Sequence, residues 1–90
     1  MTAVSREVRI SNQRGLHARA SAKFVNLASD IDAKIEVEKD GHRVCGTSIM
    51  GLMMLGAAMG DSIVIHVEGD GSEAAMQKLV ELVEDRFGEE

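Results

Sequence analysis

The alternation of apolar and polar positions along the chain predicts four β-strands that each bury one face. Arg6 interrupts the apolar face of the first strand, and His66 falls on the polar face of the fourth, where we expect it to be solvated. Asp40-Gly41 predicts a tight turn between the second strand and a short third strand, because both central residues of a type I′ turn need positive φ. The apolar positions of the four strands are Val4, Val8, Ile10, Ile35, Val37, Val44, Ile63, Ile65 and Val67.

Three further stretches are expected to form helices, two between these strands and one after the fourth. The first helix is expected over residues 18–28, after a polar loop over residues 11–15. The last helix is expected to stop at Gly88, and Glu89 and Glu90 are expected to extend into solvent. The apolar positions on these two helices are Ala20, Phe24, Leu27, Ala28 and Ile31, and Met76, Leu79, Val80, Val83 and Phe87.

The middle helix is unusual because it is apolar on all sides. Thr47 and Ser48 can cap its start, and residues 49–59 consist of apolar residues and two glycines, without a charge. Such a helix must be buried all round or must serve for docking, and a two-layer domain of this size cannot cover every side. We expect Leu52 and Leu55 in the core. The alternative for the remaining side chains is a core filled with methionine, but we favour an exposed patch that adapts to partners. The residues assigned to this patch are Ile49, Met50 and Met53.

The order strand, helix, strand, strand, helix, strand, helix predicts an α+β fold. Because every strand is one-sided, the sheet should be open and rich in antiparallel pairs, with helices covering one face. Ninety residues suffice for one domain with a modest core, so we assign residues 1–90 to a single domain. With no proline and only 2% aromatic residues, that core must be built from Val, Ile, Leu, Met and Ala.

Composition and charge narrow the classes of function. A net charge of −5, without interleaved basic and aromatic residues, argues against nucleic acid as a partner. A single cysteine fits a reducing cytoplasm, and we expect no targeting segment and no insertion into a membrane. His42 and Cys45 alone fall far short of a metal site. The sequence has no carboxylate pair and no nucleophile–base set that would indicate an enzyme. We expect a cytoplasmic protein that binds neither a metal nor a cofactor.

The stretch Gly15-Leu16-His17-Ala18-Arg19 lies where the first strand gives way to the first helix. A histidine at the start of a helix faces unpaired N–H groups and the positive end of the helix dipole, an arrangement that binds phosphate. The dipole disfavours imidazolium, and a neutral imidazole is a nucleophile. Arg19 opposes the dipole unless an anion pairs with it. These residues indicate a histidine that accepts a phosphoryl group, and the alternative is an ordinary turn histidine.

This stretch, followed by Ala20-Ser21-Ala22, resembles the phosphorylation motif of the HPr family, the histidine-containing phosphocarriers of the bacterial phosphotransferase system. Residues 47–56 resemble the second HPr signature, and the resemblance covers nearly the whole chain. It implies an open-faced β-sandwich with the order β-α-β-β-α-β-α, a four-stranded antiparallel sheet and three helices on one face. It also implies that His17 takes a phosphoryl group on Nδ1 from Enzyme I, itself charged by phosphoenolpyruvate, and passes it to an enzyme IIA-type acceptor.

The resemblance further implies roles for neighbouring residues in a carrier that is not a turnover enzyme. Arg19 would pair with the phosphoryl group, and the first-turn amides of Ala18, Arg19 and Ala20 would offset its charge. Ser48 would match the serine that HPr kinase/phosphorylase phosphorylates for regulation. The residues that would dock the donor and the acceptor in turn are Ile49, Met50 and Met53.

The sequence leaves the branch of the family open. Ala20 stands where many HPr proteins have proline, and either residue is compatible with the first turn of a helix. Residues 17–25 are similar to the nitrogen-type, NPr-like regulatory branch, so the pathway can be sugar transport or nitrogen regulation. An alternative is an HPr-like regulatory binding protein that acts through Ser48 and the methionine-rich patch without phosphoryl carriage. A small-molecule-binding ferredoxin-like domain or a small enzyme is a further alternative, but no cluster of residues supports it.

Overall fold

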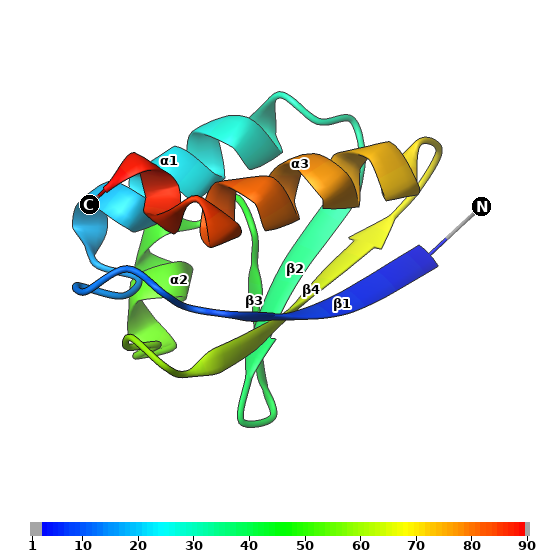
Figure 1. Cartoon of the computed structure of the whole chain (residues 1–90). Coiled ribbons are helices and arrows are strands. Elements are labelled where there is room, and N and C mark those ends of the chain that lie inside the picture. Colours follow the sequence, from blue (N-terminus) through cyan, green and yellow to red (C-terminus); the bar gives the residue numbers. More distant parts are fainter. Residues whose placement is uncertain (1–2, 90) are drawn as a thin grey trace.

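The computed structural model describes residues 3–89, and its elements follow the predicted order. They are β1 (Ala3–Arg9), α1 (Ala18–Ser29), β2 (Lys34–Lys39), β3 (His42–Cys45), α2 (Ile49–Met54), β4 (Ser62–Glu68), α3 (Ser72–Glu84) and the short 3₁₀ helix η1 (Arg86–Gly88). The predicted α+β class is confirmed, because the strands of this part of the chain form one open antiparallel sheet with the three α-helices on one side (Figure 1).

The sheet has the strand order β1–β4–β2–β3, and each neighbouring pair is antiparallel. The inner strands β4 and β2 carry its best-buried side chains. Val37 and Ile65 lie opposite each other in the β2–β4 register, and neither is exposed. The turn between β2 and β3 is formed by Asp40 and Gly41 with φ of 52° and 83°, which confirms the predicted hairpin.

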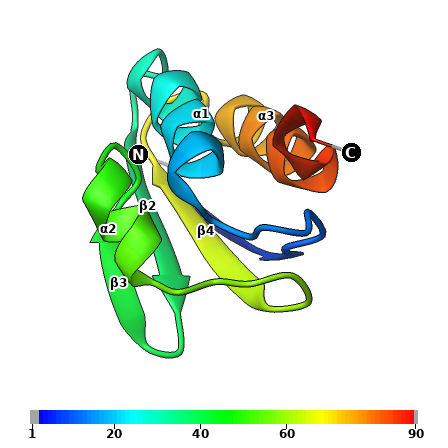
Figure 2. The same cartoon turned by 90° about the vertical axis from the view of Figure 1, so that its left-hand side faces the viewer.

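The helices form the second layer of the fold. α1 and α3 lie side by side over the sheet, and α2 packs beside α1 and β3 (Figures 1 and 2). Phe24 of α1 and Leu79 and Val83 of α3 are at most 1% exposed. Removing such apolar surface from water contributes roughly 25 cal/mol per Å² and is the main force that holds the layers together. Over residues 3–89, no helix combines the length and apolar character that crossing a membrane requires.

The middle helix is shorter than predicted. α2 ends at Met54, Leu55 is its C-cap residue, and Gly56 then adopts a left-handed conformation with φ 67°. Residues 57–59, which the prediction placed in the helix, follow without helical structure. Glycine lets the chain leave the helix at this point, and Ala57 is thereby brought into the core with 5% exposure.

The C-terminal segment also departs from the prediction. α3 ends at Glu84, so Phe87 belongs to η1 and not to the last helix. Arg86 and Phe87 adopt positive φ, which turns the chain back and buries the Phe87 ring completely. Glu89 was expected in solvent, but its side chain contacts His17. Glu90 lies outside the described residues.

Candidate phosphoryl-transfer site

A short loop between β1 and α1 brings His17 to the start of α1. Within this loop the buried Asn12 amide donates a hydrogen bond to the Gly15 carbonyl at 2.8 Å. The Leu16 N–H donates to the Ala57 carbonyl at 2.9 Å and so ties the loop to the segment after α2. Gly15 has φ 63°, a conformation that favours glycine. The predicted strand-to-helix turn is thus present.

His17 is the N-cap residue of α1. Its Nδ1 accepts a hydrogen bond from the Arg19 N–H at 3.3 Å, and its carbonyl accepts the first helical bond, from the Ser21 N–H, at 2.9 Å. Because a backbone N–H can only donate, Nδ1 carries a lone pair in this arrangement and the ring proton resides on Nε2. The ring lies at the start of α1, and because its side chain is 17% exposed it remains within reach of solvent.

The other ring nitrogen, Nε2, lies 2.6 Å from Oε2 of Glu89. The second oxygen of this carboxylate accepts a hydrogen bond from Nδ2 of Asn12 at 3.1 Å. Burial opposes ionisation of the carboxyl group, but the hydrogen bonds from His17 and Asn12 outweigh it and hold the pKa of Glu89 below its usual value. Glu89 could not be identified from the sequence, because it is 72 positions from His17 and no local pattern joins the two.

The first turn of α1 exposes Ala18 and Arg19, whereas Ala20 is buried behind them. The N–H groups of a first helical turn have no carbonyl partner within the helix, and the first turn of α1 contains no acidic residue. Among residues 3–89, no carboxylate lies within ion-pair distance of the Arg19 guanidinium. The structure thus offers the positive end of a helix at an unprotonated imidazole nitrogen, and Arg19 in the same first turn carries a positive charge. Together they can bind an anion.

Ser48 is the N-cap residue of α2, in agreement with the predicted helix cap. Its Oγ accepts a hydrogen bond from the Gly51 N–H at 3.0 Å. Shortly before it, Sγ of Cys45 lies 3.0 Å from the Thr47 hydroxyl, and hydrogen bonds from Thr47 lower the pKa of the exposed Cys45 thiol. Within the part of the chain that the structure describes, neither this region nor any other gathers three residues that could hold a metal ion.

An exposed apolar surface, here called the methionine patch, lies on α2 and the loop after it. Each member is at least 40% exposed, and the members are Ile49, Met50, Met53, Met54 and Met59. The first three match the expected patch, whereas the exposure of Met54 and Met59 was not predicted. Leu52 and Leu55 point into the core, as expected, with 0% and 9% exposure. The hydrogen bond from Leu16 to Ala57 places the loop of this patch beside the loop that precedes the histidine.

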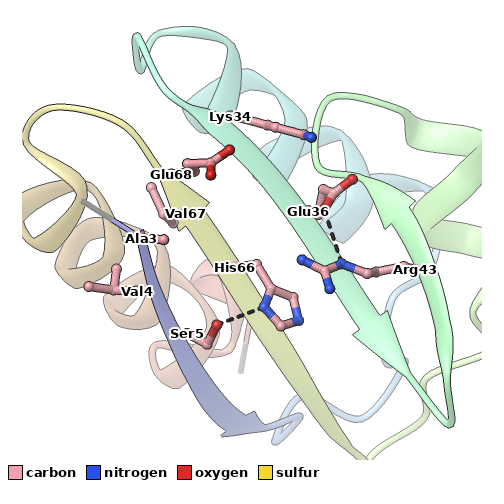
Figure 3. A pocket seen from close by; sticks show the side chains of 9 residues that line it. All are labelled: Ala3, Val4, Ser5, Lys34, Glu36, Arg43, His66, Val67 and Glu68. Carbon is pink, nitrogen blue, oxygen red and sulfur yellow. Dashed lines mark hydrogen bonds and ion pairs between the residues drawn. The ribbon is translucent and has the colours of Figure 1, made fainter. Parts of the chain in front are cut away.

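His66 lies on the open face of the sheet, as predicted, but it is not a freely solvated residue. Its Nδ1 is 2.7 Å from the Ser5 hydroxyl (Figure 3), and its Nε2 is 2.8 Å from the Glu38 carboxylate. Beside it, Arg43 and Glu36 form an ion pair at 3.0 Å. The simple alternation of side chains predicted the correct face, but it could not show that cross-strand neighbours would provide hydrogen-bond partners.

The fold and the site define a class of protein: a small open-faced β-sandwich that presents a helix-capping histidine beside an arginine. The family described as "PTS HPr component phosphorylation site" matches residues 4–85. The chain belongs to this HPr family of phosphocarriers of the phosphotransferase system.

Relatives named HPr and a relative named NPr are similar to this chain. Phosphocarrier protein HPr of Cupriavidus necator is 40% identical over 86 residues, which cover 96% of this chain and 97% of that protein. Phosphocarrier protein NPr of Shewanella violacea is 38% identical over 89 residues, or 99% and 98% of the two chains. The crystal structure of HPr from Thermoanaerobacter tengcongensis has a TM-score of 0.89 and 46% identity, covering 100% of this chain and 99% of that one.

Proposed function

We propose that His17 accepts a phosphoryl group on Nδ1 from Enzyme I, itself charged by phosphoenolpyruvate, and passes it to an enzyme IIA-type acceptor. One observation carries this proposal: Nδ1 accepts a hydrogen bond from the Arg19 N–H, so its lone pair is turned toward the amides at the start of α1. In this proposal residues 1–90 form a single HPr domain that works in the cytoplasm.

Arg19 would pair with the phosphoryl group once it is transferred. The first-turn amides of Ala18, Arg19 and Ala20 would offset its negative charge together with the helix dipole. Phosphoryl transfer depends mainly on positioning and on charge stabilisation. A helix start with one arginine provides both in a protein as small as this one.

The methionine patch would dock the donor and the acceptor in turn. Its members Ile49, Met50 and Met53 were assigned to docking from the sequence, and Met54 and Met59 are exposed as well. Methionine side chains are flexible and polarisable, so they fit partners of different shape. One surface beside His17 can therefore serve two unlike proteins.

Ser48 would be the site of regulatory phosphorylation, with HPr kinase/phosphorylase as the enzyme. A phosphate at the start of α2 is compatible with the helix dipole, so the fold would persist. It would add about −2 charge next to the apolar side chains of Ile49 and Met50. We expect this charge to weaken docking and not to act on His17 directly.

Incubation with Enzyme I and ³²P-labelled phosphoenolpyruvate tests the phosphocarrier proposal. The wild-type protein should acquire acid-labile label, His17→Ala should acquire none, and Ser48→Ala should label like the wild type. Absence of label from the wild type would instead favour the HPr-like regulatory binding protein that acts through Ser48 and the methionine patch. Transfer of the label to sugar-type or to nitrogen-type IIA proteins, compared by initial rate, would then identify the branch.

A further inference from the structure

The Glu89 carboxylate is held from two sides against the imidazole of His17. Its Oε2 lies 2.6 Å from Nε2 of His17, and its Oε1 accepts a hydrogen bond from the Asn12 amide at 3.1 Å. Asn12 is fully buried and also donates to the Gly15 carbonyl at 2.8 Å, so the protons of its amide group are both engaged. The carboxylate is therefore fixed to the same loop that positions the histidine.

The segment that carries Glu89 is anchored immediately before it. Phe87 is fully buried, and its carbonyl accepts a hydrogen bond from Nζ of Lys23 at 2.6 Å. Arg86 and Phe87 have φ of 56° and 55°, a conformation that residues other than glycine adopt only where packing compensates for it. Figure 1 shows this segment beyond the end of α3 and near the start of α1, and η1 contacts α1. The place of Glu89 thus follows from packing and is not that of a loose chain end.

We infer that Glu89 is a positioning residue for His17, which orients the imidazole, keeps its proton on Nε2 and leaves the lone pair on Nδ1. The inference rests on the proposed function, because it concerns the histidine proposed as the phosphoryl acceptor. A carboxylate oxygen binds a protonated Nε2, and the Arg19 N–H binds an unprotonated Nδ1. The contacts on the two ring nitrogens therefore select the same tautomer.

The same contact acts on the transfer step. Nδ1 gives up its hydrogen bond from the Arg19 N–H, and its lone pair forms the new bond to phosphorus. The bond from phosphorus to the leaving atom of the donor breaks, and its electron pair remains with the donor. The proton stays on Nε2, so the imidazole ring of His17 gains positive charge as the bond forms. The carboxylate of Glu89 faces this charge and stabilises it more strongly than it stabilises the uncharged ring.

Two variants of Glu89 and one control test the inference. Glu89→Gln keeps the shape and removes the charge, Glu89→Ala removes the contact, and Glu84→Gln removes an exposed carboxylate at the end of α3. The measurements are the ¹⁵N spectrum of the His17 ring, which distinguishes its tautomers, and the kcat and KM of labelling by Enzyme I. We expect kcat to fall about tenfold or more in both Glu89 variants, with KM unchanged because the methionine patch is intact. The ring of Glu89→Ala should show an increased share of the Nδ1-protonated form, and Glu84→Gln should match the wild type.

The outcomes separate this inference from the proposed function. A wild-type protein that takes no label on His17 defeats the phosphocarrier proposal, while the ¹⁵N spectra still decide whether Glu89 selects the tautomer. A labelled wild type with an unchanged spectrum and unchanged kcat in both Glu89 variants overturns the inference alone. Faster labelling of Glu89→Ala also overturns it, because the carboxylate would then obstruct the histidine. Circular dichroism of each variant checks that the fold is retained.

Discussion

Gly15 lies so close to the main chain of Ala57 that a Cβ on the glycine would be 2.3 Å from the Ala57 carbonyl oxygen. The same carbonyl accepts the hydrogen bond from Leu16 at 2.9 Å. Two loops that are far apart in the sequence, one before His17 and one after α2, are thus joined through their main chains. This contact holds the histidine and the methionine patch in a constant relative position.

Gly15→Ala should lower the free energy of unfolding by more than about 1 kcal/mol, measured by urea denaturation. Alanine is strained at φ 63°, and its methyl group would collide with backbone atoms that cannot move aside. Gly41→Ala is a matched control, because it has φ 83° but a Cβ there meets nothing within 4 Å. Equal losses in the two variants would mean that the contact with Ala57 does not require glycine.

Two substitutions within α2 should distinguish residues that stabilise the fold from residues that dock Enzyme I. Leu52→Ala removes a side chain with no exposure and should cost about 2–5 kcal/mol of unfolding free energy. Met50→Ala, at a position that is 70% exposed, should change stability by less than about 0.5 kcal/mol and raise the KM for Enzyme I. Denaturant unfolding and labelling kinetics measure the two effects, and wild-type kinetics of Met50→Ala would remove this residue from the docking surface.

Ser48→Ala should destabilise the protein by about 1 kcal/mol, because the Gly51 N–H loses its acceptor at the start of α2. Ser48→Asp should keep the helix cap, since aspartate caps as well as serine, yet it should slow labelling by Enzyme I because it brings a negative charge beside the patch. Thermal denaturation and initial labelling rates test these expectations. If Ser48→Asp labels at the wild-type rate, charge at this position does not regulate docking.

The contribution that the contact between Glu89 and His17 makes to stability should be lost in acid. Because hydrogen bonds from His17 and Asn12 hold the pKa of Glu89 below its ordinary value of 4.5, folding favours the ionised carboxylate. Its contribution to stability is therefore fully present above pH 4.5 and is lost as the pH falls through the lower folded-state value. The difference in unfolding free energy between the wild type and Glu89→Gln, measured by urea denaturation from pH 7 to pH 3, should shrink only at the acidic end. A difference that disappears near pH 6 would contradict this.

The elements of this fold could be predicted because their signals are local. Alternation over a few residues marks β2 and β4, and the pair Asp40-Gly41 adopts the positive φ that its turn type requires. Apolar composition over residues 49–59 suggested one long helix, but composition cannot show where a helix ends. Gly56 ends it through a left-handed conformation, and Ala57 is buried in a loop. Likewise, the side of the sheet on which His66 lies could be predicted, but its hydrogen bonds to neighbouring strands could not.

The sequence by itself determined the setting of the proposed nucleophile: His17 at the start of a helix, Arg19 in the first turn and Ser48 at the next helix cap. Capping and periodicity depend on residues within a few positions of one another, so they can be read from the chain. Only the tertiary structure decided which groups meet the second ring nitrogen of the histidine. The Glu89 carboxylate reaches it across 72 positions, because burial of the Phe87 ring turns the chain back onto α1, and no short-range pattern encodes that packing.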